Sequence, residues 1–238
     1  MVIYASYTAV VSDVPDGTRS ADATWLSADA LAWPSDSDTL LPTAAADPAM
    51  SADLDWLRYW ARGTATFHAL GFREAAELLA PRVGHGPGQE EALVYPFAFC
   101  WRHHLELQLK MLIPEAADFL DDPLSDAARK DLRHSHDLAE LWAHCRPLLE
   151  RVDQRESGAL EDIQRLLTEL SGLDPNPGVA FRYPTLKDGT TPTLATIDHL
   201  DVGNFHKACL GLSNAFSGWS EMIDHWRSAA PTSQELGP

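Results

Sequence analysis

The most constraining feature of the sequence is an unbroken apolar repeat near its C-terminal end. Steps of four and three residues place successive side chains on one face of an α-helix. The repeat therefore predicts a long helix over residues 197–228, whose apolar face seals either a core or a dimer seam. The residues that form it are Phe205, Cys209, Leu212, Phe216, Trp219, Ile223 and Trp226.

Five earlier segments show the spacing or composition of helices, separated by Gly, Pro and polar residues. The segment 92–113 is apolar on most sides, which predicts a central position in a bundle. Pro147 is expected to kink its helix, and Gly172 to end the helix before it. A long loop containing a Lys187-Asp188-Gly189 turn signal is expected over 172–194. The predicted helices cover residues 52–79, 92–113, 125–133, 135–152 and 157–171.

Residues 1–50 differ in composition from the rest of the chain. They contain seven Asp, no Glu and one basic residue, Arg19. The first eleven residues have the β-branched and aromatic bias of a short strand, and Trp25 and Trp33 are isolated anchors for docking. We therefore predict a mainly α protein. Its parts are an N-terminal extended arm (1–50), a helical domain (51–230) and a disordered tail (231–238).

The charge balance is strongly acidic, with 18 Lys and Arg against 35 Asp and Glu and a net charge of −17. Such a chain repels a phosphate backbone at long range, so non-specific nucleic-acid binding is disfavoured. The cysteines Cys100, Cys145 and Cys209 are widely spaced in apolar helical segments, which predicts free thiols in a reducing cytoplasm. Neither a signal peptide nor a membrane span is predicted.

Four short motifs follow one another along the chain, and together they resemble a group of bacterial HEPN-like proteins. In that group a helix of the type RHxLELxLK precedes an HDLxxLW helix and an FRYP loop. The resemblance implies an α-helical bundle, often a homodimer, and a role in toxin, phage-defence or RNA-processing systems. The motifs are FREAAELL (72–79), YPFAFCWRHHLELQLKML (95–112), HDLAELW (136–142) and FRYP (181–184).

Many HEPN proteins are metal-independent ribonucleases whose signature is an Arg and a His four to six residues apart. The Arg stabilises the phosphate and the His moves a proton. Here no His follows Arg102 at that distance. About two suitable pairs are expected by chance in a chain of this composition, so the existing pairs carry little weight. They are Arg62 with His68, Arg129 with His134, and Arg129 with His136.

The candidate catalytic residues are Arg102, Glu106 and His136. Arg102, Glu106 and Lys110 are spaced i, i+4 and i+8, which places alternating charges on one stripe of a helix. Arg102 with Glu106 forms either a functional polar pocket or a structural ion pair. In the functional hypothesis Arg102 holds phosphate and His136 transfers the proton, leaving a cyclic phosphate.

The candidate binding residues are His103, Asp137, Arg182 and Tyr183. Asp137 either orients His136 as a general base or begins a helix, where an acidic residue favours the N-terminus. Arg182 either binds phosphate through its forked guanidinium or caps helix carbonyls while Phe181 and Tyr183 pack on the core.

No metal and no cofactor are predicted, because the histidines lack the spacing and the carboxylate or thiolate partners of a metal site. The leading hypothesis is a HEPN-like protein of a toxin or phage-defence system that acts on RNA or a nucleotide. The alternative is a non-catalytic interaction or sensor module, such as an antitoxin or an assembly subunit. A homodimer or another protein is the expected partner.

Overall fold

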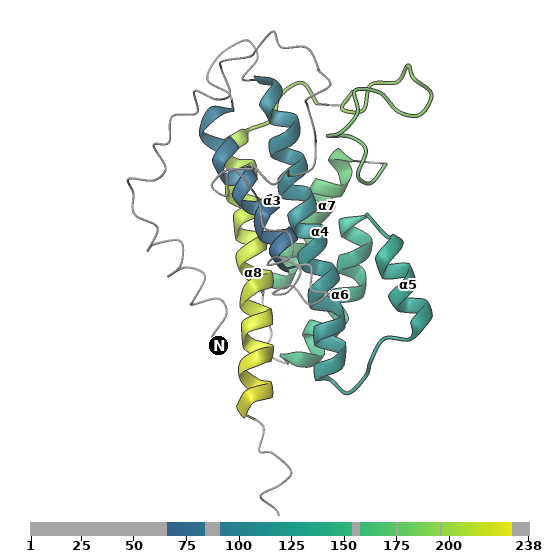
Figure 1. Cartoon of the computed structure of the whole chain (residues 1–238), viewed down its shortest axis with the longest axis vertical. Helices are drawn as coiled ribbons and strands as arrows, with labels where there is room; N and C mark the ends of the chain where they lie inside the picture. The colour runs from purple at the N-terminus through teal and green to yellow at the C-terminus, as the bar shows by residue number, and fades with distance from the viewer. Residues whose placement is uncertain (1–65, 84–90, 154–157, 175, 196, 230–238) are drawn as a thin grey trace, which may run out of the picture. The chain divides into compact units, whose positions relative to one another are not determined.

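The structure is a computed structural model, and it describes most of the chain from residue 66 onward (Figure 1). The predicted arm, its strand, the first half of the 52–79 helix and the tail lie outside the described residues. All described residues belong to one unit, Ala61–Pro238. The described ranges are 66–83, 91–153, 158–174, 176–195 and 197–229.

The described part of the chain is mainly α-helical, as predicted, and it contains no strand beyond one isolated bridge between Thr185 and Pro192. None of its helices is both long and apolar enough to cross a bilayer. The elements are α3 (Thr66–Leu79), η3 (Ala80–Arg82), η4 (Glu91–Leu93), α4 (Val94–Phe119), α5 (Asp126–His134), α6 (Leu138–Val152), α7 (Gly158–Leu173) and α8 (Val202–Ala229), where η denotes a 3-10 helix.

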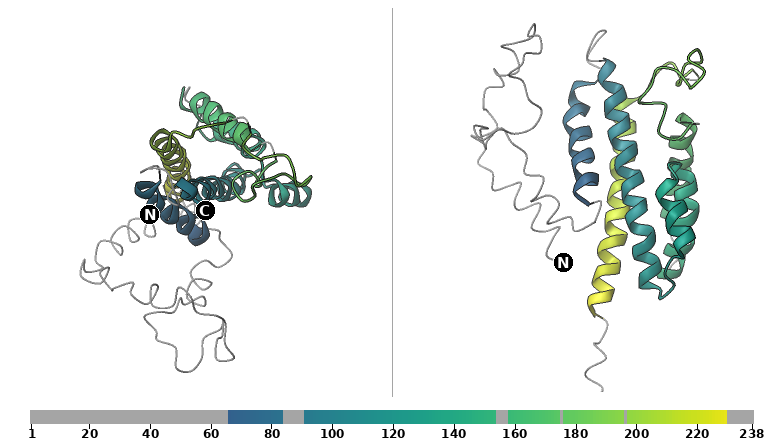
Figure 2. Two further views of the ribbon diagram at one scale, coloured as in Figure 1. Left: turned by 90° about the horizontal axis from the view of Figure 1, so that it is seen from above. Right: turned by 45° about the vertical axis from the view of Figure 1, so that its right-hand side comes forward.

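Helix α4 lies at the centre of the bundle, as its apolar composition predicted. It packs against α3, α6 and α8, while α7 packs on α6 (Figure 2). Of its 26 residues, 14 are buried, and they face in several directions around the helix. Polar side chains on α4 are therefore enclosed by neighbouring elements and need partners there.

The apolar repeat of α8 closes the core of this bundle. Cys209, Leu212, Phe216 and Ile223 are each at most 2% exposed. The helix begins at Val202 rather than at the predicted residue 197. The reason is a cap at Asp201, whose carboxylate accepts a hydrogen bond of 3.0 Å from the Asn204 amide.

Other helix boundaries also differ from the sequence-based prediction. Helix α4 continues past Pro114 to Phe119, because Ala116 and Ala117 beyond the proline are fully buried. Helix α7 likewise runs past Gly172 to Leu173. Helix α6 begins at Leu138, after its N-cap Asp137, and remains one continuous helix through Pro147.

The predicted loop before α8 is a series of turns. The Asp188 carboxylate accepts hydrogen bonds of 2.9 Å from the amides of Thr190 and Thr191, and Gly189 has a φ of 73°. This confirms the turn signal at residues 187–189. The Thr193 hydroxyl donates to the Tyr183 carbonyl at 2.8 Å and so holds the two ends of the turn together.

Candidate functional site

The predicted charged stripe is present on α4, with Glu106 at its centre. The Arg102 guanidinium lies 3.2 Å from one Glu106 carboxylate oxygen, and the Lys110 ammonium lies 2.9 Å from the other. The Arg102 and Glu106 side chains are each only 3% exposed, whereas Lys110 is 17% exposed. Two cations of the same helix thus hold one buried carboxylate.

Arg102 also joins α4 to the segments that precede α6 and follow α7. Its Nε lies 2.7 Å from Asp174 Oδ2, and a terminal guanidinium nitrogen donates to the carbonyl of His136. Three segments distant in sequence therefore converge on a single guanidinium. With its two carboxylate partners buried beside it, Arg102 is a positioning residue and its charge is already balanced.

Asp174 is a member of this site that the sequence analysis did not identify. It is 2% exposed, and its carboxylate accepts hydrogen bonds from the amides of Gly178, Val179 and Ala180. Gly178 has a φ of 81°, a region that glycine enters without steric cost. The sequence Asp-Pro-Asn-Pro-Gly at 174–178 is rich in the residues that favour turns. The turn was foreseeable, but its pairing with Arg102 depends on the tertiary fold.

His136 is the exposed end of the site. Its Nδ1 lies 2.9 Å from Glu106 Oε1, while 56% of its side chain is exposed. A carboxylate can only accept a hydrogen bond, so Nδ1 of the neutral ring carries the hydrogen and Nε2 is left as the acceptor. A buried carboxylate thus fixes both the tautomer and the orientation of an exposed imidazole, an arrangement suited to proton transfer.

The charge of Glu106 is stabilised by its neighbours. Burial raises the pKa of this carboxyl, but contacts with His103, Lys110 and His136 outweigh it and lower the pKa to about 2. Lys110 and His136 are the close partners, at 2.9 Å each, whereas His103 Nδ1 lies at 3.9 Å, beyond hydrogen-bond distance. Glu106 is therefore ionised at neutral pH and able to hold His136.

Aromatic contacts connect this site to the FRYP loop. The His103 ring stacks on Phe99 at 5.6 Å and meets the edge of Phe72 at 4.5 Å. The Arg182 guanidinium lies 5.8 Å from the same Phe99 ring. Phe99, His103, Glu106 and Lys110 follow one another at helical spacing, so Arg182 approaches the stripe that also carries Glu106.

The FRYP loop residues match the predicted packing role only in part, and the phosphate-binding role of Arg182 stays a prediction. The Arg182 Nε donates to the Gly178 carbonyl of its own turn, while the side chain as a whole is exposed. Phe181 is 6% exposed and packs on the core, as one hypothesis expected. Tyr183 instead is 55% exposed, and its ring lies 5.4 Å from the Arg182 guanidinium.

Asp137 does not orient His136. Its carboxylate accepts hydrogen bonds from the amides of Ala139 and Glu140 at 2.8 and 3.3 Å, and from the Ser171 hydroxyl at 3.1 Å. These are the contacts of a helix N-cap, the second of the two roles considered for it. Glu106 supplies the orienting carboxylate in its place.

A second polar network lies on the side of α4 that faces α3 and α8. The His104 ring bonds the Ala69 carbonyl at 2.7 Å and the Ser213 hydroxyl at 2.8 Å. Gln108 donates to the Ser213 carbonyl and to the Ser217 hydroxyl. Burial lowers the pKa of His104 to about 4, although the hydrogen bond to Ala69 opposes this shift. The ring is therefore neutral at physiological pH.

Comparisons with other proteins give no assignment for this site. The chain matches no protein-family profile, and neither a curated protein nor a solved structure matches it significantly. Over the described residues, no three His, Cys, Asp or Glu side chains are arranged to hold a metal ion. The resemblance to HEPN-like proteins remains a prediction from the sequence motifs.

Proposed function

We propose that this protein is a HEPN-like, metal-independent endoribonuclease of a bacterial toxin or phage-defence system, with His136 as its proton-transfer group. One observation carries the proposal: an exposed imidazole is held through Nδ1 by a buried, ionised Glu106 at 2.9 Å. A structural histidine gains no stability from keeping its ring in water, whereas a general base needs such access.

In the proposed reaction, Nε2 of His136 takes the proton from the 2′-hydroxyl of the RNA. The 2′-oxygen then attacks the adjacent phosphorus, the bond from phosphorus to the 5′-oxygen breaks, and that oxygen leaves with a proton from water. The products are a 2′,3′-cyclic phosphate and a 5′-hydroxyl end. Glu106 keeps the imidazole in its tautomer and stabilises the imidazolium that forms.

Residues nearer the surface than Arg102 are better placed to bind a phosphate. Arg102 is 3% exposed and engaged by Glu106, Asp174 and the His136 carbonyl, so a phosphate has no access to it. Lys110 and Arg182 are the cations on or beside the stripe that reach solvent. We propose that they contact the phosphate, with Arg102 holding the catalytic carboxylate and loops in place.

The net charge of −17 limits how such an enzyme binds RNA. With few cations at the site, affinity for RNA is expected to be low. Its dependence on salt is expected to be shallow, because few counterions are released when few phosphates are neutralised. A conditional activity, released by a partner or a second copy of the chain, is consistent with this charge.

A non-catalytic interaction or sensor module is the second candidate. The buried, charge-balanced Arg102 network supports it, because this network fixes loops as effectively in a scaffold as in an enzyme. The acidic charge also suits an antitoxin or assembly subunit better than a free nuclease. In this candidate the function lies in a homodimer or a complex with another protein.

Cleavage of RNA by the purified protein in excess chelator tests the proposal. His136→Asn is compared with His134→Asn, a matched change at another exposed histidine two positions away. We expect the wild type and His134→Asn to produce cyclic phosphate ends, and His136→Asn to lose activity by about 100-fold or more.

Each other outcome is decisive. Equal cleavage by His136→Asn removes His136 from the reaction. Absence of cleavage by all three folded proteins, in low salt and over a range of RNA sequences, favours the interaction module. Light scattering and a pull-down from the host then identify the assembly.

A further inference from the structure

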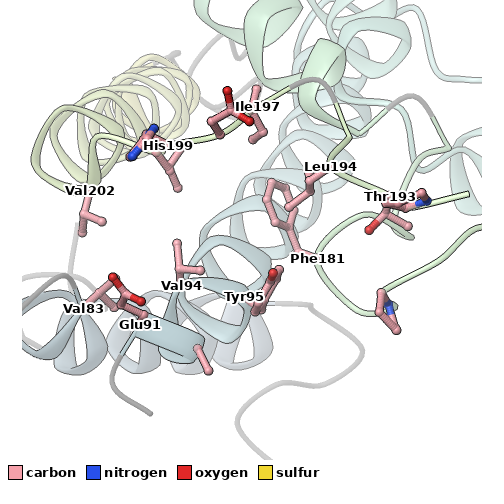
Figure 3. A pocket seen from close by; sticks show the side chains of 15 residues that line it. Val83, Glu91, Val94, Tyr95, Phe181, Thr193, Leu194, Ile197, His199 and Val202 are labelled. Carbon is pink, nitrogen blue, oxygen red and sulfur yellow. The ribbon is translucent and has the colours of Figure 1, made fainter. Parts of the chain in front are cut away.

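A pocket of about 720 Å³ opens where η4, the start of α4, the segment 181–200 and the start of α8 meet (Figure 3). Figure 3 shows Val94 and Tyr95 on one side of it and Ile197 and His199 on the other. No proposed catalytic residue lines this pocket. Its volume lies within the range of small-molecule sites, roughly 300–1,000 Å³.

The walls of the pocket are largely apolar. Val83 follows η3, Val94 begins α4, Val202 begins α8, and Phe181 and Leu194 come from the long loop. Phe181 is only 6% exposed, so it forms a firm wall, whereas Tyr95 is 48% exposed and its ring is accessible. A ligand with an apolar body gains from leaving water here.

Apart from the titratable imidazole of His199, the ionisable lining groups with an acidic or strongly basic side chain are all acidic. Glu91 and Asp198 contribute carboxylates, and neither Lys nor Arg is among the lining residues. Within the described residues, no hydrogen bond or ion pair joins either carboxylate to another group. Two carboxylates with no Lys or Arg among the lining residues disfavour nucleotides and other anions, and they favour a cation.

We propose that this pocket binds a small organic cation, an ammonium group carried on an apolar body. The carboxylates attract the ammonium, the apolar walls cover the body, and the accessible ring of Tyr95 offers an aromatic face that attracts cations. A bare metal ion does not suit the site, because the lining is mostly hydrocarbon and contains only two carboxylates. The proposal does not depend on cleavage of RNA.

Binding of phenethylammonium to the full-length protein, measured by calorimetry, tests the proposal. Phenethyl alcohol is the neutral match and hydrocinnamate the anionic match, so the three probes share one apolar body. We expect the ammonium compound to bind about tenfold more tightly than the alcohol, and the carboxylate to bind most weakly.

The double variant Glu91→Gln, Asp198→Asn locates the site. Both side chains are exposed, so the fold is expected to persist, which circular dichroism checks. The ammonium affinity should fall about tenfold while the affinity for the alcohol stays the same. Glu221→Gln, an exposed carboxylate of α8 outside the pocket, should change neither.

Three results would overturn the proposal. Equal affinities for the ammonium and the alcohol would show that charge is not recognised. If Glu221→Gln weakened ammonium binding as much as the double variant does, the effect would come from the net charge and not from the pocket. Absence of binding by all three probes at millimolar concentration would show that the pocket takes no ligand of this class.

Discussion

Helix α4 carries two buried polar networks on nearly opposite faces, and the two end differently. Arg102 and Glu106 point to one side of the helix. His104 and Gln108 point to the other side, because each lies two residues further along and two residues turn an α-helix by about 200°. The Arg102 network, which includes Asp174, reaches solvent at the exposed imidazole of His136. The His104 network instead ends at Ser213, whose hydroxyl also accepts from the part-exposed guanidinium of Arg73 at 3.5 Å.

The difference separates a structural polar network from a candidate site. The buried members of the His104 network are neutral groups, the His104 residue is 1% exposed, and their hydrogen bonds join α3, α4 and α8. The one charged group on this network, Arg73, reaches Ser213 from the part-exposed side of α3 and is paired there with Glu77. The Arg102 network contains formal charges, and one end is a titratable ring in water. Buried charge that supports an exposed acid–base group is the pattern expected of function.

The two networks are expected to differ most in how much the free energy of unfolding falls when one of their side chains is replaced. Arg102→Met leaves Glu106 and Asp174 buried without their shared cation, which we expect to lower the free energy of unfolding by about 3–5 kcal/mol. Ser213→Ala removes a neutral hydroxyl and should cost about 1–2 kcal/mol. Urea unfolding at pH 7 measures both.

Equal costs for these two variants would contradict the distinction between a network of buried charges and a network whose buried members are neutral. A cost below about 1 kcal/mol for Arg102→Met would show that the two carboxylates find other partners or water. In that case the guanidinium would not be the residue that holds the loops before α6 and after α7.

The two networks are also expected to weaken in different pH ranges. Burial lowers the pKa of His104 from 6.5 to about 4, so the folded state resists its protonation, and the stability present above pH 6.5 is lost as the pH falls towards 4. Burial raises the pKa of Glu106, but contacts with neighbouring cations and histidines outweigh it and lower the pKa from 4.5 to about 2. The stability that the ionised Glu106 contributes is therefore lost as the pH falls from about 4.5 to 2. Each shift corresponds to about 3 kcal/mol.

Variants that do not titrate isolate these contributions. The stability advantage of the wild type over His104→Asn should fall by about 3 kcal/mol from pH 7 to pH 4, so that it vanishes or reverses sign at pH 4. The difference between the wild type and Glu106→Gln should stay constant down to about pH 5 and shrink only below it. Urea unfolding at each pH measures both differences, and coincident ranges would contradict the assignment of separate networks.

The sequence predicted those features that depend on local spacing. The apolar repeat predicted a long helix that seals either a core or a dimer seam, and α8 does close the core. The i, i+4 spacing of Arg102 and Glu106 placed them together on one stripe of α4, and the two form an ion pair there. The N-cap role of Asp137 was also one of the two alternatives considered. Each of these follows from neighbours within one or two helical turns.

The features that the sequence did not predict depend on how distant segments meet. Asp174 pairs with Arg102 only because the turn after α7 packs on α4, and no local pattern specifies that contact. The continuation of α4 past Pro114 likewise reflects burial by neighbouring elements, which overrides the local preference of proline. The carboxylates of the pocket, Glu91 and Asp198, come from segments that are far apart in sequence.

The smallest effect on stability is expected at the residue most important for the proposed chemistry. His136→Asn should change the free energy of unfolding by about 0.5 kcal/mol or less, because the ring is 56% exposed and Glu106 keeps Arg102 and Lys110 as partners. The same change at His104 should cost about 1–3 kcal/mol, since its buried partners lose their hydrogen bonds. Thermal and urea unfolding compare the two variants.

If His136→Asn is as destabilising as His104→Asn, the imidazole is a structural link between α4 and α6. If it is nearly neutral, the fold does not need this ring, and its orientation by a buried carboxylate is explained by what it does at the surface.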